Sequence, residues 1–222
     1  MTDGTDKGER KSAVATRRGD DGTTGLLFGG ERVRKDDPRT EAFGAIDEAV
    51  AGLGVARAEL IQMELRGELP RVLAGLAEVV LQIQRELFVA AAELATAPGA
   101  ADRQRLGETR VSAEMVAGLD AILAETEAHV QMPQEFVVPG ETRLSAEIEL
   151  ARTLVRRAER RAVGVRGAEP VAGDQLVPYL NRLADLLWVF ARAAEQGEAR
   201  SATPSRPGGR RRPARTGVDP GA

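Results

Sequence analysis

A glycine-rich segment near the start of the chain combines residue types that bind polyphosphates. It runs from Thr16 to Lys35 and joins glycines, threonine hydroxyls and basic side chains ahead of a helix-start signal at Asp37 and Pro38. Glycines let backbone N–H groups approach an anion closely, and hydroxyls and cations add further favourable contacts. The segment therefore predicts an anion site. A flexible linker is the alternative, because neither a phosphate-loop motif nor the strand context of a dinucleotide fingerprint occurs here.

A second group of candidate ligands lies in the arginine-rich segment 152–161. With about 100° of rotation per helical residue and Arg152 at zero, Arg156 lies near 40°, Arg160 near 80° and Glu159 near −20°. This charged face flanks the apolar stripe of the helix and does not oppose it. Guanidinium groups suit forked contacts to phosphate, so the face predicts phosphate binding, with a solvated salt-bridge surface as the alternative.

Other polar and aromatic residues have less specific surroundings. Asn181 and Asp185 lie one helical turn apart, where they can bind a ligand or satisfy a neighbouring helix. Asp47 lies near the packed side of an earlier helix and needs a partner such as arginine if it is buried. Phe136 lies outside any predicted helix, and the pattern favours a plug for the core. The single histidine, His129, is expected to be exposed or to cap a helix end.

Apolar residues at alternating spacings of four and three indicate helices packed in a bundle. The segment 132–140 carries two prolines and an apolar centre, so an extended connector is expected there. Five long amphipathic helices with almost no two-residue alternation predict an all-α, five-helix up-and-down bundle. The predicted helices are Pro38 to about Arg66, the leucine series from Leu69 until Pro98 and Gly99, Ser112 to about Val130, Leu144 to Val165, and Leu176 to at least Phe190.

The composition fits one domain and excludes several classes of protein. The 222 residues suffice for a single sizeable core, and we expect disorder at 1–13, a folded domain over 14–197 and a disordered Pro/Gly/Arg-rich tail over 198–222. With 31 basic and 34 acidic residues the net charge is −3, so no general attraction to nucleic acid or to an anionic membrane is expected. Absent cysteine and a lack of long apolar stretches favour a cytoplasmic protein.

Taken in order, these motifs resemble the PduO-type ATP:cob(I)alamin adenosyltransferases over about residues 14–195. The blocks that carry the resemblance are Thr16-Arg-Arg-Gly-Asp-Asp-Gly-Thr-Thr-Gly25, Gly29-Gly-Glu-Arg32, Lys35-Asp-Asp-Pro38, 41–44, 46–48, Phe136-Val-Val-Pro-Gly140, 151–161 and 179–187. The resemblance implies a homotrimer of helical bundles with ATP bound between subunits. It also implies transfer of the 5′-deoxyadenosyl group of ATP to the cobalt of cob(I)alamin, with magnesium on the triphosphate and a reductase or a cobalamin-dependent acceptor enzyme as further partners.

The resemblance further assigns roles to single residues. The residues that would wrap the triphosphate are Thr16, Arg17, Arg18, Gly19, Gly22, Thr23, Thr24, Gly25 and Lys35. Those that would complete the nucleotide site are Arg156, Glu159, Arg160 and Asn181. Phe136 would press on the corrin and displace the lower cobalt ligand, and Asp185 matches a position near the corrin pocket. Asp47 and Arg152 match positions that pair across the subunit boundary, and no protein side chain is assigned to a metal.

The sequence departs from the family pattern at several positions. Arg17 and Arg18 stand where the family often has Lys and Thr, Val50 replaces a common Asn, and Glu149 stands where His is frequent. The last two departures bear on corrin affinity.

Two other classes of protein are alternatives to an adenosyltransferase. A ferritin-like metal bundle needs Glu-x-x-His pairs, and one histidine cannot supply them. A non-catalytic interaction bundle would use a basic tail to bind an acidic partner. The arginines of that tail are Arg206, Arg210, Arg211, Arg212 and Arg215.

Overall fold

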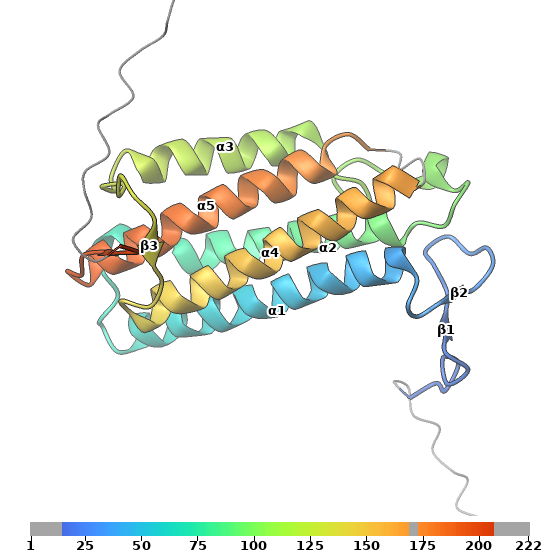
Figure 1. Cartoon of the computed structure of the whole chain (residues 1–222), viewed down its shortest axis with the longest axis horizontal. Helices are drawn as coiled ribbons and strands as arrows, with labels where there is room; N and C mark the ends of the chain where they lie inside the picture. The colour runs from blue at the N-terminus through green and yellow to red at the C-terminus, as the bar shows by residue number, and fades with distance from the viewer. Residues whose placement is uncertain (1–14, 169–172, 207–222) are drawn as a thin grey trace, which may run out of the picture.

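A computed structural model of the protein describes residues 15–168 and 173–206, and helices dominate these ranges. The α-helices in the described ranges are α1 (Pro38–Leu65), α2 (Leu76–Ala95), α3 (Ala113–Glu127), α4 (Arg143–Ala168) and α5 (Leu176–Gly197). Figure 1 shows them lying side by side along the long axis of the molecule. The predicted all-α class and the five helices are confirmed.

The helix starts follow the capping signals in the sequence. The side chain of Asp37 accepts a hydrogen bond from the backbone N of Arg39 at 2.8 Å, and Pro38 occupies the first helical position of α1. At α3, Oγ of Ser112 accepts from the backbone N of Met115 at 3.4 Å. Both predicted N-caps therefore lie where the sequence placed them.

The second helix begins later than the leucine series predicted. Residues Arg71–Leu73 form a short 3-10 helix (η1), and α2 starts only after Gly75, whose φ of +78° is left-handed. Only glycine adopts that conformation without steric cost, so the glycine at this position allows the break in the helix. Leu73 is nevertheless buried, and the apolar spacing continues from it to the buried Leu76 and Val80 of α2.

The core is built around α1, which packs against both α2 and α4, while α5 packs against α4 and α3. Small residues line the contact between α1 and α4, and a Cβ added at Gly52 would lie 2.7 Å from Cδ1 of Leu154. The two backbones approach closely here because Gly52 has no side chain.

Two short antiparallel ribbons lie at opposite ends of the bundle (Figure 1). At one end, β1 (Thr23–Thr24) pairs with β2 (Val33–Arg34); at the other, β3 (Val137–Val138) pairs with β4 (Thr203–Pro204). The predicted extended connector thus contains β3. Residues 198–206, expected to belong to the tail, include β4, whereas the disorder expected for 1–13 and 207–222 concerns residues outside the described ranges. Across the described ranges, no helix is both long and apolar enough to cross a bilayer.

Candidate active site

The glycine-rich segment forms a hydrogen-bonded loop, and several of its hydrogen bonds involve Thr23. Oδ1 of Asp21 accepts from the backbone N of Thr23 at 2.9 Å and from its Oγ1 at 2.8 Å, and these bonds hold the pKa of the Asp21 carboxyl below its usual value. Arg32 donates from Nε to Oγ1 of Thr23 at 2.7 Å and from Nη2 to the carbonyl of Arg18 at 2.8 Å. The backbone N of Lys35 donates a hydrogen bond to the carbonyl of Gly22 at 2.9 Å, next to the pairing of β1 with β2. These bonds favour a built loop over the flexible-linker alternative.

Arg32 is a residue of the site to which no role was assigned from the sequence. It stands in the Gly-Gly-Glu-Arg block that helped to carry the family resemblance, so the signal was present. What the pattern did not indicate is that its guanidinium faces inward to the loop. Arg32 therefore supports the loop, and its hydrogen bonds to Thr23 and Arg18 distinguish it from the cations whose donors are free for a ligand.

Lys35 presents an exposed amine, and within residues 15–168 and 173–206 no ion pair or hydrogen bond engages that amine. A Cβ added at Gly19 would lie 3.0 Å from both Cε and Nζ of Lys35. The missing side chain at Gly19 thus lets the lysine lie against the loop backbone. Lys35 opens on a cleft of about 230 Å³, whose lining residues are Lys35, Thr40, Glu41, Gly44, Ala45, Glu48, Arg157 and Arg161.

The four arginines of α4 between positions 156 and 161 divide into two pairs with different surroundings. Arg157 forms an ion pair with Glu48, and Nη2 of Arg161 lies 3.8 Å from Oε2 of Glu41, both on α1. Arg156 and Arg160 are exposed, and in the part of the chain that the structure describes neither has an ion pair or hydrogen bond. The salt-bridge alternative therefore applies to one pair, while the other keeps its donors free for an anion.

Beside the free pair, α4 and α5 are joined by a polar contact. Nδ2 of Asn181 donates to Oε1 of Glu159 at 3.1 Å, and Asn181 is exposed while Glu159 is half-buried. The structure thus brings Glu159 and Asn181 together on the surface that carries Arg156 and Arg160. Exposure of Asn181 and Asp185 removes the alternative that they are buried residues satisfying another helix.

Phe136 stands at a large cleft at the β3 end of the bundle. It is 87% exposed, so the expectation that it plugs the core is wrong for this chain. The segment around it is held at the surface by β4, and the backbone N of Ser205 donates to the carbonyl of Phe136 at 2.8 Å. The cleft measures about 860 Å³, within the usual range for small-molecule sites. Its lining residues are Pro133, Gln134, Glu135, Phe136, Val137, Pro139, Glu149, Arg152, Ala184, Asp185, Trp188, Ser205 and Arg206.

The predicted site residues fall into separate regions of one chain. The loop with β1 and β2 lies beyond the N-terminus of α1, whereas β3, which contributes Val137 to the Phe136 cleft, lies at the other end of the bundle (Figure 1). Arg156 and Arg160 follow Arg152 on α4 by one and two turns, a rise of about 6 and 12 Å. Asp47 is exposed on α1 and, among the described residues, forms no ion pair with Arg152, whose Nε instead donates to Oε2 of Glu149 at 2.6 Å. One chain therefore does not assemble the whole predicted site.

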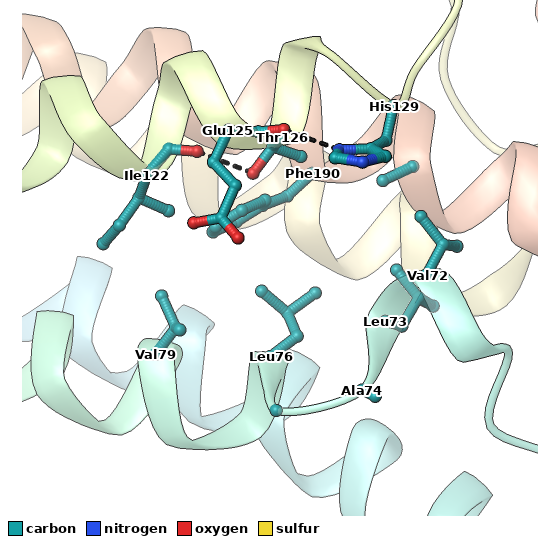
Figure 2. Close-up of a pocket in the computed structure, with 12 residues that line it drawn as sticks. Val72, Leu73, Ala74, Leu76, Val79, Ile122, Glu125, Thr126, His129 and Phe190 are labelled. Atoms are coloured by element: carbon teal, nitrogen blue, oxygen red, sulfur yellow. Dashed lines mark hydrogen bonds between the residues drawn. The ribbon is translucent and has the colours of Figure 1, made fainter.

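A further groove of about 430 Å³ lies between the start of α2 and the facing sides of α3 and α5. Figure 2 shows Leu76 and Val79 facing Ile122 across it. His129 lies at its rim, exposed, with Nδ1 2.9 Å from the carbonyl oxygen of Glu125. The expectation that His129 is exposed or caps a helix end is confirmed. None of the residues predicted for the site lines this mostly apolar groove.

Comparisons with known proteins agree with this geometry. A family model described as cobalamin adenosyltransferase matches residues 14–194. The corrinoid adenosyltransferase of Citrobacter freundii is 40% identical over 184 residues, which are 82% of this chain and 94% of that relative. The cobalamin adenosyltransferase of Cupriavidus metallidurans is 37% identical over 185 residues, covering 83% and 89% of the two chains.

A solved structure adds the ligands of the fold. A variant of the PduO-type ATP:corrinoid adenosyltransferase from Lactobacillus reuteri, complexed with cobalamin and ATP, superposes with a TM-score of 0.75 at 25% identity. The match covers 87% of this chain and 96% of that one. Together with the family model over nearly the whole folded part, these likenesses show that the chain belongs to the cobalamin adenosyltransferase family.

Proposed function

We propose that this chain transfers the 5′-deoxyadenosyl group of ATP to cob(I)alamin in a site completed by a second copy of the chain. The activity itself follows from family membership: the protein is an ATP-dependent corrinoid adenosyltransferase, and ATP and cobalamin are its substrates. The observation that supports the two-chain site is that the cleft lined by Lys35 shares no residue with the Phe136 cleft, and that Arg156 and Arg160 line neither of them.

We infer the positions of the two substrates from the surface formed by α4 and α5. The corrin would occupy the cleft walled by Phe136, Arg152 and Asp185, because this cavity of about 860 Å³ joins an exposed aromatic ring to polar walls. The triphosphate would lie one to two turns further along α4, against Arg156 and Arg160. The reacting C5′ then faces the cleft, and the leaving triphosphate faces the unpaired guanidiniums.

A neighbouring copy would bring its glycine-rich loop over the triphosphate. Lys35 and the residues assigned to nucleotide binding in the loop are exposed or half-exposed, so they are accessible to a second chain. Closed rings are the usual result when unlike surfaces of identical chains meet, and a homotrimer is the ring that we propose. Asp47 of one copy would then reach Arg152 of the next.

The reaction needs positioning and charge stabilisation, and the chain offers no nucleophile of its own for it. Cobalt(I) provides the electron pair, the new cobalt–carbon bond forms at C5′, and the C5′–oxygen bond breaks as triphosphate leaves. Arg156, Arg160 and Lys35 would stabilise the negative charge that develops on the leaving oxygen. Phe136, held at the mouth of the cleft, would exclude water and the lower cobalt ligand from the metal.

Magnesium would be held by the triphosphate, because the described ranges contain no group of three or more His, Cys, Asp or Glu side chains that could hold a metal. Its charge would add to that of the guanidiniums. We further propose a cytoplasmic location, on the absence of cysteine.

The activity is tested by mixing the purified protein with ATP, magnesium and chemically reduced cobalamin. The expected products are triphosphate and a light-sensitive cobalt–carbon bond, seen by visible absorbance. ATP binding without either product would contradict the proposal and would favour a non-catalytic interaction bundle.

A further inference from the structure

A buried network of charged side chains lies behind the wall of the Phe136 cleft. The Arg192 side chain on α5 is fully buried, and its Nη2 donates to Oε1 of Glu149 at 3.2 Å and to Oε1 of Glu195 at 2.8 Å. Glu149, on α4, is 3% exposed and accepts from Nε of Arg152 through its other oxygen at 2.6 Å. The bonds run from Arg192 through Glu149 to Arg152, from the core to the surface of the cleft.

Only the outer members of the network reach the cleft. Glu149, Arg152 and Trp188 line it, whereas Arg192 and Glu195 do not. The guanidinium carbon of Arg192 also lies 5.5 Å from the centre of the Trp188 ring. Arg192 therefore supports two wall residues from behind and cannot itself touch a ligand in the cleft.

A contribution to the stability of the core does not by itself explain this buried network. Nε and Nη1 of Arg192 and Oε2 of Glu195 are buried without a hydrogen-bond partner among the described residues. Each such atom costs about 1–3 kcal/mol, and buried ion pairs can often be replaced by apolar residues without loss of stability. A network that carries this cost is better explained by what it holds in place.

We propose that Glu149, anchored by Arg192, is a positioning residue that fixes the guanidinium of Arg152 at the corrin side of the cleft. The inference rests on the proposed function, which assigns the corrin to this cleft. A bond at Nε sets the plane of the guanidinium and leaves Nη1 and Nη2 as donors. Within one chain, in the described residues, Glu149 is the sole hydrogen-bond or ion-pair partner of Arg152, so Glu149 fixes the plane of the guanidinium whose free donors Asp47 of a second copy would also reach.

The test compares E149Q with a matched control on the same helix. Glu147 is also a glutamate of α4 that pairs with an arginine, Arg143, at 3.0 Å, but it lies outside the cleft. For E149Q we expect a KM for cob(I)alamin and a Kd for cob(II)alamin raised about tenfold, the loss of one charge-assisted bond. The KM for ATP and kcat should stay within about twofold, and E147Q should leave all four quantities unchanged.

A double-mutant cycle separates positioning from a general structural effect. If Glu149 acts through Arg152, E149Q should change corrin affinity by less than about twofold in an Arg152→Ala background. Arg192→Lys keeps the buried charge but loses the guanidinium that donates to both Glu149 and Glu195. Its effect on corrin affinity should likewise disappear in the Arg152→Ala background. This variant replaces E149Q in the test if E149Q fails to fold. Normal corrin affinity in E149Q, or an equal loss in both backgrounds, would overturn the inference. An inactive wild-type chain would refute the proposed function instead, while the Kd comparison would still decide the role of Glu149.

Discussion

Replacing Phe136 by alanine should remove function while leaving stability almost intact. A fully buried phenylalanine covers about 150–250 Å² of surface. Because Phe136 is 87% exposed, the remaining 13% corresponds to roughly 25 Å², or about 0.6 kcal/mol at 25 cal/mol per Å². For a domain of this size the melting temperature should fall by only about 1–3 °C.

Two other phenylalanines provide controls for this variant. Phe190 is 3% exposed in the core, so Phe190→Ala should cost roughly 3–5 kcal/mol. Phe88 is 58% exposed on α2 and lies outside the Phe136 cleft, so Phe88→Ala should change neither stability nor turnover much. In contrast, Phe136→Ala should lower kcat/KM for cob(I)alamin by about tenfold or more, since water and the lower ligand would reach the cobalt.

The assay combines urea unfolding with steady-state adenosylation for the three variants. The reasoning is refuted if Phe136→Ala destabilises the chain by more than about 2 kcal/mol, which would mean that the ring is buried in the core after all. It is equally refuted if turnover with cob(I)alamin matches that of the wild-type chain.

Three further outcomes are expected. Arg156→Ala should lower kcat by about 100-fold or more without unfolding, because a free guanidinium is lost from the leaving group, and turnover with stability measured together would show it. Gly19→Ala should raise the KM for ATP about threefold to tenfold at unchanged corrin KM, since the new Cβ would lie 3.0 Å from Nζ of Lys35; unchanged ATP kinetics would contradict this. Burial raises the pKa of Tyr179, the chain's single tyrosine, well above 10.0, so its neutral form favours folding and that contribution is lost as pH rises through the folded pKa. Tyrosinate absorbance should therefore appear only together with loss of the helical circular dichroism signal, and its appearance near pH 10 in folded protein would contradict the burial.

Local sequence signals predicted most of the fold. The apolar spacing placed α4 and α5, and the caps at Asp37 and Ser112 placed the starts of α1 and α3. The spacing failed at Gly75, because a left-handed residue can interrupt a helix while the buried side chains on either side keep their register.

The candidate site was predictable in its residue types but not in its partners. Spacing placed Arg156 and Arg160 on one charged face, but only Glu41 and Glu48 of α1 decide that their neighbours Arg157 and Arg161 are paired. These contacts join residues more than a hundred positions apart, so no local pattern contains them.

The same limit explains Phe136 and Arg192. An isolated aromatic in a polar connector resembles a core residue until the β3–β4 pairing holds it outside. An arginine among apolar residues of α5 gives no sign that α4 supplies its carboxylate partner.

The central claim is that one active site needs two chains, and subunit mixing tests it most directly. Chains carrying Lys35→Ala and chains carrying Arg156→Ala are each expected to be nearly inactive. Coexpressed at equal amounts and purified through two different tags, they should regain about a third of wild-type turnover, because in either mixed trimer one of the three sites combines an intact loop with an intact arginine. If each site belonged to a single chain, every site would carry one substitution, and mixed assemblies with no recovered adenosylation would contradict the account.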